Sequence, residues 1–145
     1  MKIIDRNGPK IKFSDDILSV VLSHAQGNPG AIAALSAILS EPDGIIYLVA
    51  INELGLKGQY IYMLWSDVCG KDIVKFKDAL IMMQQGIISD EVSIANLSRG
   101  RALPLFDESI ARPEKASELP NYYKKQADKF LENYAEELGL PINGN

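Results

Sequence analysis

The stretch SHAQGNPGAIAALSAIL, residues 23–39, contains the end of one predicted helix, a glycine turn and the start of the next helix. Asn28 is a favourable N-cap, and Pro29 suits the first turn of a helix because its missing N–H is not needed there. The stretch therefore predicts two packed helices joined by a tight turn at 27–30. The expected apolar face of the second helix comprises the large side chains Ile32, Leu35 and Leu39, beside a small face of Ala31, Ala34 and Ala37.

Apolar stripes that end at glycine or proline continue along the chain on both sides of this turn. Ser14 is a favourable N-cap, and Asp15 and Asp16 place negative charge where the helix dipole favours it. Asp43 and Asp72 precede later helices in the same way. Glycine just beyond the last apolar position is a common helix end. The predicted helices cover residues 15–26, 29–41, 45–54, 59–69, 72–85, 89–99 and 118–139.

Two segments lack this helical pattern. Residues 1–13 carry an Asn-Gly pair between two short alternating runs, which favours a β-hairpin, and residues 101–117 contain prolines without a sustained period. A chain of 145 residues fits one domain with a buried core. We therefore expect a mainly α, single-domain helical bundle of about seven helices. Its parts are a short N-terminal β-hairpin or arm (1–13), a helical core (14–100), a strap (101–117) and a C-terminal amphipathic helix (118–139).

The composition argues against several function classes. A net charge of −4 disfavours a general nucleic-acid binder, because affinity for phosphates depends on clustered Lys and Arg. One cysteine allows no internal disulfide, and a single His with a single Cys is too few for a usual structural metal site. Residues 44–51, the longest mostly apolar stretch, are too few to cross a bilayer, and the N-terminus lacks the apolar run of a signal peptide. We expect a cytoplasmic protein without metal, cofactor or membrane association.

The glycine turn at 27–30 is also a candidate anion site. Free backbone N–H groups at a helix N-terminus bind phosphate or carboxylate, and glycine lets a ligand approach the backbone closely. The turn matches neither the dinucleotide fingerprint nor the P-loop, so a plain turn between helices is the alternative interpretation. We expect a non-enzymatic binding protein for a small phosphorylated or nucleotide ligand. The candidate ligand-binding residues are His24, Asn28, Gly30, Tyr60, Tyr62, Arg99 and Arg101.

The C-terminal helix carries an aromatic stripe, and its opposite face is almost entirely charged or amide. Aromatic side chains are typical of both cores and interfaces. The stripe therefore packs on its own core, or it forms a homo-oligomer contact or enters a partner's groove. The candidate oligomer-interface residues are Tyr122, Tyr123, Phe130 and Tyr134.

Two further functions stay open as alternatives. Residues 52–67 have the outline of a helix-turn-helix, although nearby basic residues are few. The second helix would offer the bases Gln59, Tyr60, Tyr62 and Ser66. His24 with Asp67 or Cys69 is the second alternative, a small hydrolase. We assign no catalytic residue, because a cysteine near a helix C-terminus is poorly placed to form a thiolate.

The run NPGAIAALSAIL (28–39) and the glycine-flanked LGLKGQYIYMLWSDVCGKDIVKF (54–76) resemble small uncharacterised proteins of bacteriophages and prophage-bearing bacteria. The resemblance covers roughly residues 14–86 and supplies no reaction or catalytic residue. It implies an accessory protein that binds, blocks or sequesters a host protein, a nucleic acid or a small nucleotide signal in the bacterial cytoplasm.

Overall fold

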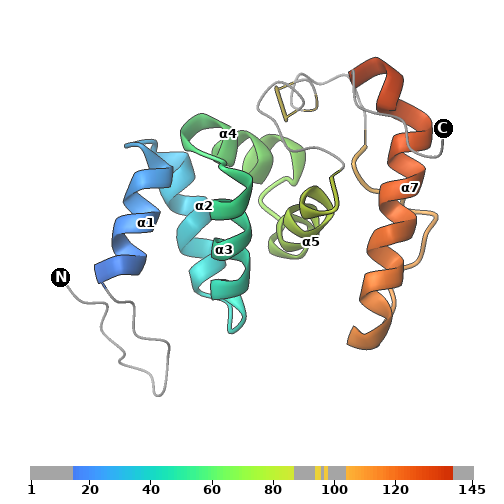
Figure 1. Ribbon diagram of the computed structural model, residues 1–145, viewed down its shortest axis with the longest axis horizontal. Helices are drawn as coiled ribbons and strands as arrows, with labels where there is room; N and C mark the ends of the chain where they lie inside the picture. The colour runs from blue at the N-terminus through green and yellow to red at the C-terminus, as the bar shows by residue number, and fades with distance from the viewer. Residues whose placement is uncertain (1–14, 87–93, 96, 98–103, 139–145) are drawn as a thin grey trace.

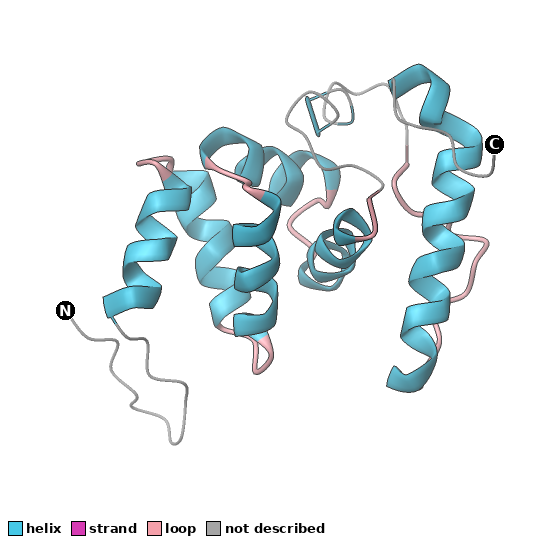
Figure 2. Cartoon of the chain, viewed as in Figure 1, coloured by secondary structure: helices cyan, strands magenta, loops and turns pink. Residues whose placement is uncertain are grey.

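The computed structural model describes residues 15–86, 94, 95, 97 and 104–138. Within these ranges the chain is an all-α single domain with six α-helices, and no strand occurs (Figure 2). The elements are α1 (Asp15–Ala25), α2 (Pro29–Leu39), α3 (Gly44–Leu54), α4 (Gly58–Tyr62), the π-helical η1 (Met63–Val68), α5 (Ile73–Gln84), the 3-10 turn η2 (Ala116–Glu118) and α7 (Leu119–Leu138). The mainly α prediction is confirmed; the predicted hairpin at 1–13 and most of the predicted helix at 89–99 lie outside the described residues.

Helix α2 is the centre of the N-terminal half. It packs against α1, α3 and α4, whereas α5 packs against α3 on the other side. Helix α7 then packs against α5 and lies at the far end of the molecule from α1 (Figure 1). The C-terminal helix therefore reaches the N-terminal half mainly through α5.

The turn before α2 forms as the sequence predicts, because Asn28 caps the helix and Pro29 begins it. The Asn28 Oδ1 accepts a hydrogen bond from the Ala31 N–H at 3.1 Å. The prediction of the apolar face of α2 is wrong at one residue, because Ile32 is 39% exposed. The fully buried face is instead Ala31, Ala34, Leu35 and Ile38, because the two alanines let neighbouring helices come close.

Gly30 marks the closest approach between α2 and α4. A Cβ atom at Gly30 would overlap the aromatic ring of Tyr62. Glycine is required here for lack of space, not for its backbone freedom, because the residue lies in the first turn of a regular helix.

The helix ends follow local sequence signals in most cases. Gly55 ends α3 in the left-handed region at φ 70°, as expected for glycine. The Asp72 carboxylate caps α5 by accepting from the N–H groups of Val74 at 2.9 Å and Lys75 at 3.1 Å. Asp43 differs, because its side chain makes no cap hydrogen bond and pairs with Lys77 instead.

The predicted helix at 59–69 is not a single regular α-helix. It begins as the five-residue α4 and changes to the π-helical η1 at Met63. The Cys69 N–H donates to the Leu64 carbonyl at 3.0 Å, a bond five residues apart. This wider turn keeps Leu64, Trp65 and Cys69 all buried.

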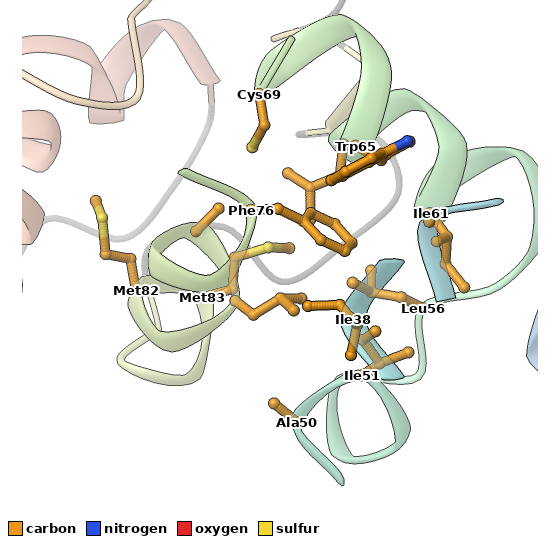
Figure 3. Packing of buried hydrophobic residues seen from close by; sticks show 14 of the residues in the cluster. Ile38, Ala50, Ile51, Leu56, Ile61, Trp65, Cys69, Phe76, Met82 and Met83 are labelled. Atoms are coloured by element: carbon orange, nitrogen blue, oxygen red, sulfur yellow. The ribbon is translucent and has the colours of Figure 1, made fainter. Parts of the chain in front are cut away.

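The main core lies between η1, α5 and the helices α2 and α3. The rings of Trp65 and Phe76 meet edge to face, with centroids 5.0 Å apart (Figure 3). Ile38 and Ile51 approach from the other side, and both are fully buried. Side chains from four elements therefore share one apolar interior.

We predict that Gly30→Ala lowers the free energy of unfolding by about 1–3 kcal/mol, because the added methyl group overpacks the contact with Tyr62. In a Tyr62→Ala background the same substitution costs less, since the ring is gone. Urea unfolding of the two single variants and the double variant measures this coupling. An equal cost in both backgrounds would show that the ring of Tyr62 is not the obstacle.

Candidate functional site

His24 is a buried link between α1 and the turn after α3. Its side chain is 5% exposed. Nδ1 donates to the Leu56 carbonyl at 2.6 Å, and Nε2 lies 2.9 Å from the Asn52 Oδ1. Both contacts are satisfied by a doubly protonated ring, or by a neutral ring with the Asn52 amide in the opposite orientation. Neither nitrogen of His24 is left for a ligand or a substrate in this arrangement.

The backbone amides of the glycine turn are also largely occupied. Pro29 has no N–H, the Ala31 N–H bonds to the Asn28 side chain, and the Ile32 N–H bonds to the Asn28 carbonyl at 3.0 Å. Gly30 faces the ring of Tyr62. The turn thus has the hydrogen bonds and packing of a helix junction.

The other candidate ligand residues fall in different places. The structure brings Tyr62 together with Gly30, as the sequence grouping expects, but through direct packing. Tyr60 is half-buried against the core. Arg99 and Arg101 lie outside the described residues.

Cys69 has the properties of a core residue. The side chain is 2% exposed and lies beside Trp65 and Phe76 (Figure 3). Burial raises the pKa of the thiol to about 12, so the nucleophilic thiolate is almost absent near neutral pH. With both nitrogens of His24 engaged and Asp67 exposed on η1, the three residues of the hydrolase alternative do not form a nucleophile and base pair.

The outline of a helix-turn-helix is present in α3, the turn at 55–57 and α4. Gln59 is exposed at the start of α4, but Tyr62 is packed against Gly30 of α2. The second helix has five residues before the π-helical turn begins. The helix that contacts the bases in DNA-binding proteins presents several side chains along one regular face. The regular face of α4 is short by comparison.

The aromatic stripe of α7 packs within its own chain. Tyr122, Tyr123 and Phe130 are 9%, 7% and 2% exposed. Tyr134 is half-buried, and its ring centroid lies 5.2 Å from that of Phe130. The stripe therefore fits the first of the two interpretations, a helix on its own core, while self-association of the whole protein stays a prediction.

A buried charged group joins α5 to the strap and to α7. The carboxylate of Asp78 is in a side chain that is 3% exposed. Its Oδ1 accepts from the Tyr123 hydroxyl at 2.7 Å, and its Oδ2 accepts from the Arg112 guanidinium. Burial raises the pKa of Asp78, whereas the hydrogen bond from Tyr123 and the charge of Arg112 act in the opposite direction.

No pattern in the sequence predicts this cluster. Its members are 34 and 45 residues apart along the chain, so no local motif connects them. The one available signal was Asp78 itself, an acid four residues before Met82 in a largely apolar helix. A buried acid requires partners, although the sequence does not say which ones.

A second charged cluster holds the turn between α2 and α3 against α5. The Lys77 ammonium lies 3.2 Å from the Glu41 Oε1 and 3.0 Å from the Asp43 Oδ1. It also lies 5.3 Å from the ring centroid of Tyr47. Its one ammonium and two carboxylates contact one another, so the cluster serves to hold the turn against α5.

A hollow of about 330 Å³ opens between residues 104–108 of the strap and α7. We call it the strap–α7 hollow. Its aromatic lining is Phe106, Phe130 and Tyr134. Its polar lining is Asp107, Glu108, Gln126, Lys129 and Asn133. A smaller hollow, of about 100 Å³, lies farther along the strap beside Ile110 and Asn121.

Gln126 of α7 connects this helix to the strap through hydrogen bonds. Its Oε1 accepts from the Asp107 N–H at 2.7 Å, and its Nε2 donates to the Asp107 carbonyl at 3.0 Å. The Nε2 also lies 3.2 Å from the Tyr122 hydroxyl. These bonds fix the strap on the helix, so the wall of the hollow is held by hydrogen bonds and not by apolar contact alone.

The part of the chain that the structure describes contains no group of three or more His, Cys, Asp or Glu side chains arranged to hold a metal ion. Within the same residues, no helix combines the length and the apolar character needed to span a membrane. Comparisons with protein-family models, with curated proteins and with solved structures find no match for this chain.

We predict that Cys69 of the native protein reacts very slowly with an aromatic disulfide reagent at pH 8. With a pKa of about 12, about one thiol in 10,000 is ionised at that pH, and its burial excludes the reagent. The released thiolate chromophore measures the rate, and full reaction in urea provides the control. Fast reaction of the native chain would instead indicate an accessible thiolate and favour the hydrolase alternative.

We predict that Tyr123→Phe lowers the free energy of unfolding by about 1.5–3 kcal/mol, because it removes a hydrogen bond to the buried Asp78 carboxylate. The matched control is Tyr122→Phe, which removes a neutral hydrogen bond to Gln126 and costs about 0.5–1.5 kcal/mol. Urea unfolding measures both variants. Equal losses would show that the charge on Asp78 adds nothing to the contact.

Proposed function

We propose that this protein is a non-enzymatic binding protein and that the strap–α7 hollow is its ligand site. The observation that carries the proposal is the contrast between this hollow and the chemically reactive groups. His24, Cys69 and Asp78 are all buried in structural contacts, whereas the hollow presents aromatic rings beside polar groups at an accessible surface.

The lining has the composition of a ligand site. Binding pockets for small molecules combine apolar and aromatic walls with a few polar groups, and their volumes start at about 300 Å³. The hollow, at about 330 Å³, matches the lower end of that range. It therefore suits one small molecule or one large side chain of a partner.

The walls are held in place before a ligand arrives. Gln126 joins the strap to α7 through two hydrogen bonds to Asp107, and Phe130 is 2% exposed in the core behind the hollow. A site with preformed walls loses less freedom on binding, which favours affinity. The role of an accessory phage protein that captures a small ligand or blocks a host protein belongs to this same proposal.

We predict that a panel of nucleotides, small carboxylic acids, organic cations and dipeptides contains a class that raises the melting temperature. A ligand at one hundred times its Kd stabilises the native state by about 2.7 kcal/mol, or roughly 5–10 °C in this size range. Asn133→Trp fills the hollow and removes the shift, because Asn133 is an exposed lining residue.

The matched control is Asn121→Trp, the same substitution on the same helix outside this hollow. It leaves the shift unchanged. If no class stabilises the protein, or if both tryptophan variants lose the shift equally, the hollow is not the ligand site and the proposal is overturned.

A further inference from the structure

The charges around the strap–α7 hollow are unequal. Its lining contains two carboxylates, from Asp107 and Glu108, and one ammonium group, from Lys129. The Lys129 ammonium is itself 3.8 Å from the Glu132 carboxylate, one turn along the helix. That exposed ion pair is weak, but the lining still carries two negative charges against one positive charge, so the rim of the hollow is negative on balance.

Both carboxylates of the rim are weakly engaged by other cations. Asp107 accepts from the Ser109 N–H at 2.9 Å and from the Ser109 hydroxyl at 2.6 Å, and these bonds lower the pKa of Asp107. Glu108 has a side chain that is 85% exposed, and its carboxylate is 3.8 Å from the Lys75 ammonium. An exposed ion pair of that length is worth little, so Glu108 is available to a stronger partner.

The aromatic rings of the hollow favour the same sign of ligand charge. The faces of aromatic rings carry negative charge density and attract ammonium and guanidinium groups, most strongly when those groups lose water. Phe106 comes from the strap, and Tyr134 comes from α7 next to the buried ring of Phe130. The strap and α7 therefore each contribute an aromatic ring to the lining that also contains the two carboxylates.

We propose that the strap–α7 hollow binds an organic cation of the guanidinium or alkylammonium type, with Asp107 and Glu108 supplying the opposite charge and Phe106 and Tyr134 contacting the apolar part. This inference rests on the proposed function and names the ligand class of the same site. It departs from the phosphorylated ligand that the sequence alone favoured at 27–30, because phosphate is repelled by this rim.

The volume of the hollow is consistent with this ligand. About 330 Å³ exceeds what one ammonium group needs and accommodates a guanidinium group with its methylene stem. An arginine side chain has that shape, and it is planar enough to lie along an aromatic ring. The same chemistry reaches the protein as a free small cation or as a basic side chain on a partner.

The test uses the full chain labelled for NMR and titrated with arginine blocked at both ends. The matched probe is blocked citrulline, which has nearly the same shape without the charge, and blocked glutamate is the anionic probe. We expect arginine to bind at least tenfold more tightly than citrulline and glutamate not to bind. The affinity for arginine falls as salt rises, because added ions screen the carboxylates.

Two variants place the charge requirement in the hollow. Glu108→Gln and Asp107→Asn each weaken arginine binding severalfold. Glu114→Gln, which removes the same charge from an exposed strap residue outside the lining, leaves the affinity unchanged. If all three variants weaken arginine binding equally, the affinity depends only on the net charge of the protein, and the inference is overturned.

The outcomes separate the inference from the function on which it rests. If citrulline or glutamate binds as tightly as arginine and Asn133→Trp blocks it, the hollow is a ligand site and the cation inference fails. If none of the probes and no member of the wider panel binds, both fail. A short arginine-containing peptide that binds more tightly than blocked arginine assigns the cation to a protein partner, and equal affinity assigns it to a small molecule.

Discussion

The carboxylate of Asp78 imposes the strictest requirement in the described part of the chain. A buried charge is costly unless partners compensate it, and both partners of Asp78 come from the C-terminal segment: Arg112 from the strap and Tyr123 from α7. Apolar contact alone would permit several placements of an amphipathic helix on α5. The paired carboxylate selects one placement, and Gln126 then fixes the strap along the helix. The position of the strap–α7 hollow depends on both contacts.

Residues that suggest chemistry in the sequence serve packing in the N-terminal half. His24 uses both ring nitrogens to join α1 to the turn after α3. Gly30 is small so that α4 can approach α2, and Cys69 fills space beside Trp65. The accessible polar surface next to aromatic rings is instead found where two segments distant in sequence meet. Function is accordingly proposed at the junction and not at the glycine turn.

The features that the sequence predicted are those that depend on neighbours within a few residues. Asn28 and Asp72 cap their helices because a side-chain oxygen reaches an amide two or three positions away, and Gly55 ends α3 for an equally local reason. The Asp78 cluster and the hollow require residues more than 15 positions apart to meet, and no periodicity encodes such a meeting. Ile32 was misplaced for a related reason: side-chain size alone does not reveal which face of α2 receives a close neighbour.

The π-helical turn at Met63–Val68 is a local irregularity that sets the direction of the whole chain after it. Each residue of a regular α-helix rotates the following chain by about 100°, and η1 holds one residue more between bonded groups than an α-turn does. Shortening this turn by one residue would regularise its hydrogen bonds and swing Cys69, α5 and everything after them to another side. Chain length between Tyr62 and Asp72 is therefore a constraint of its own, beside the burial of the side chains in this segment.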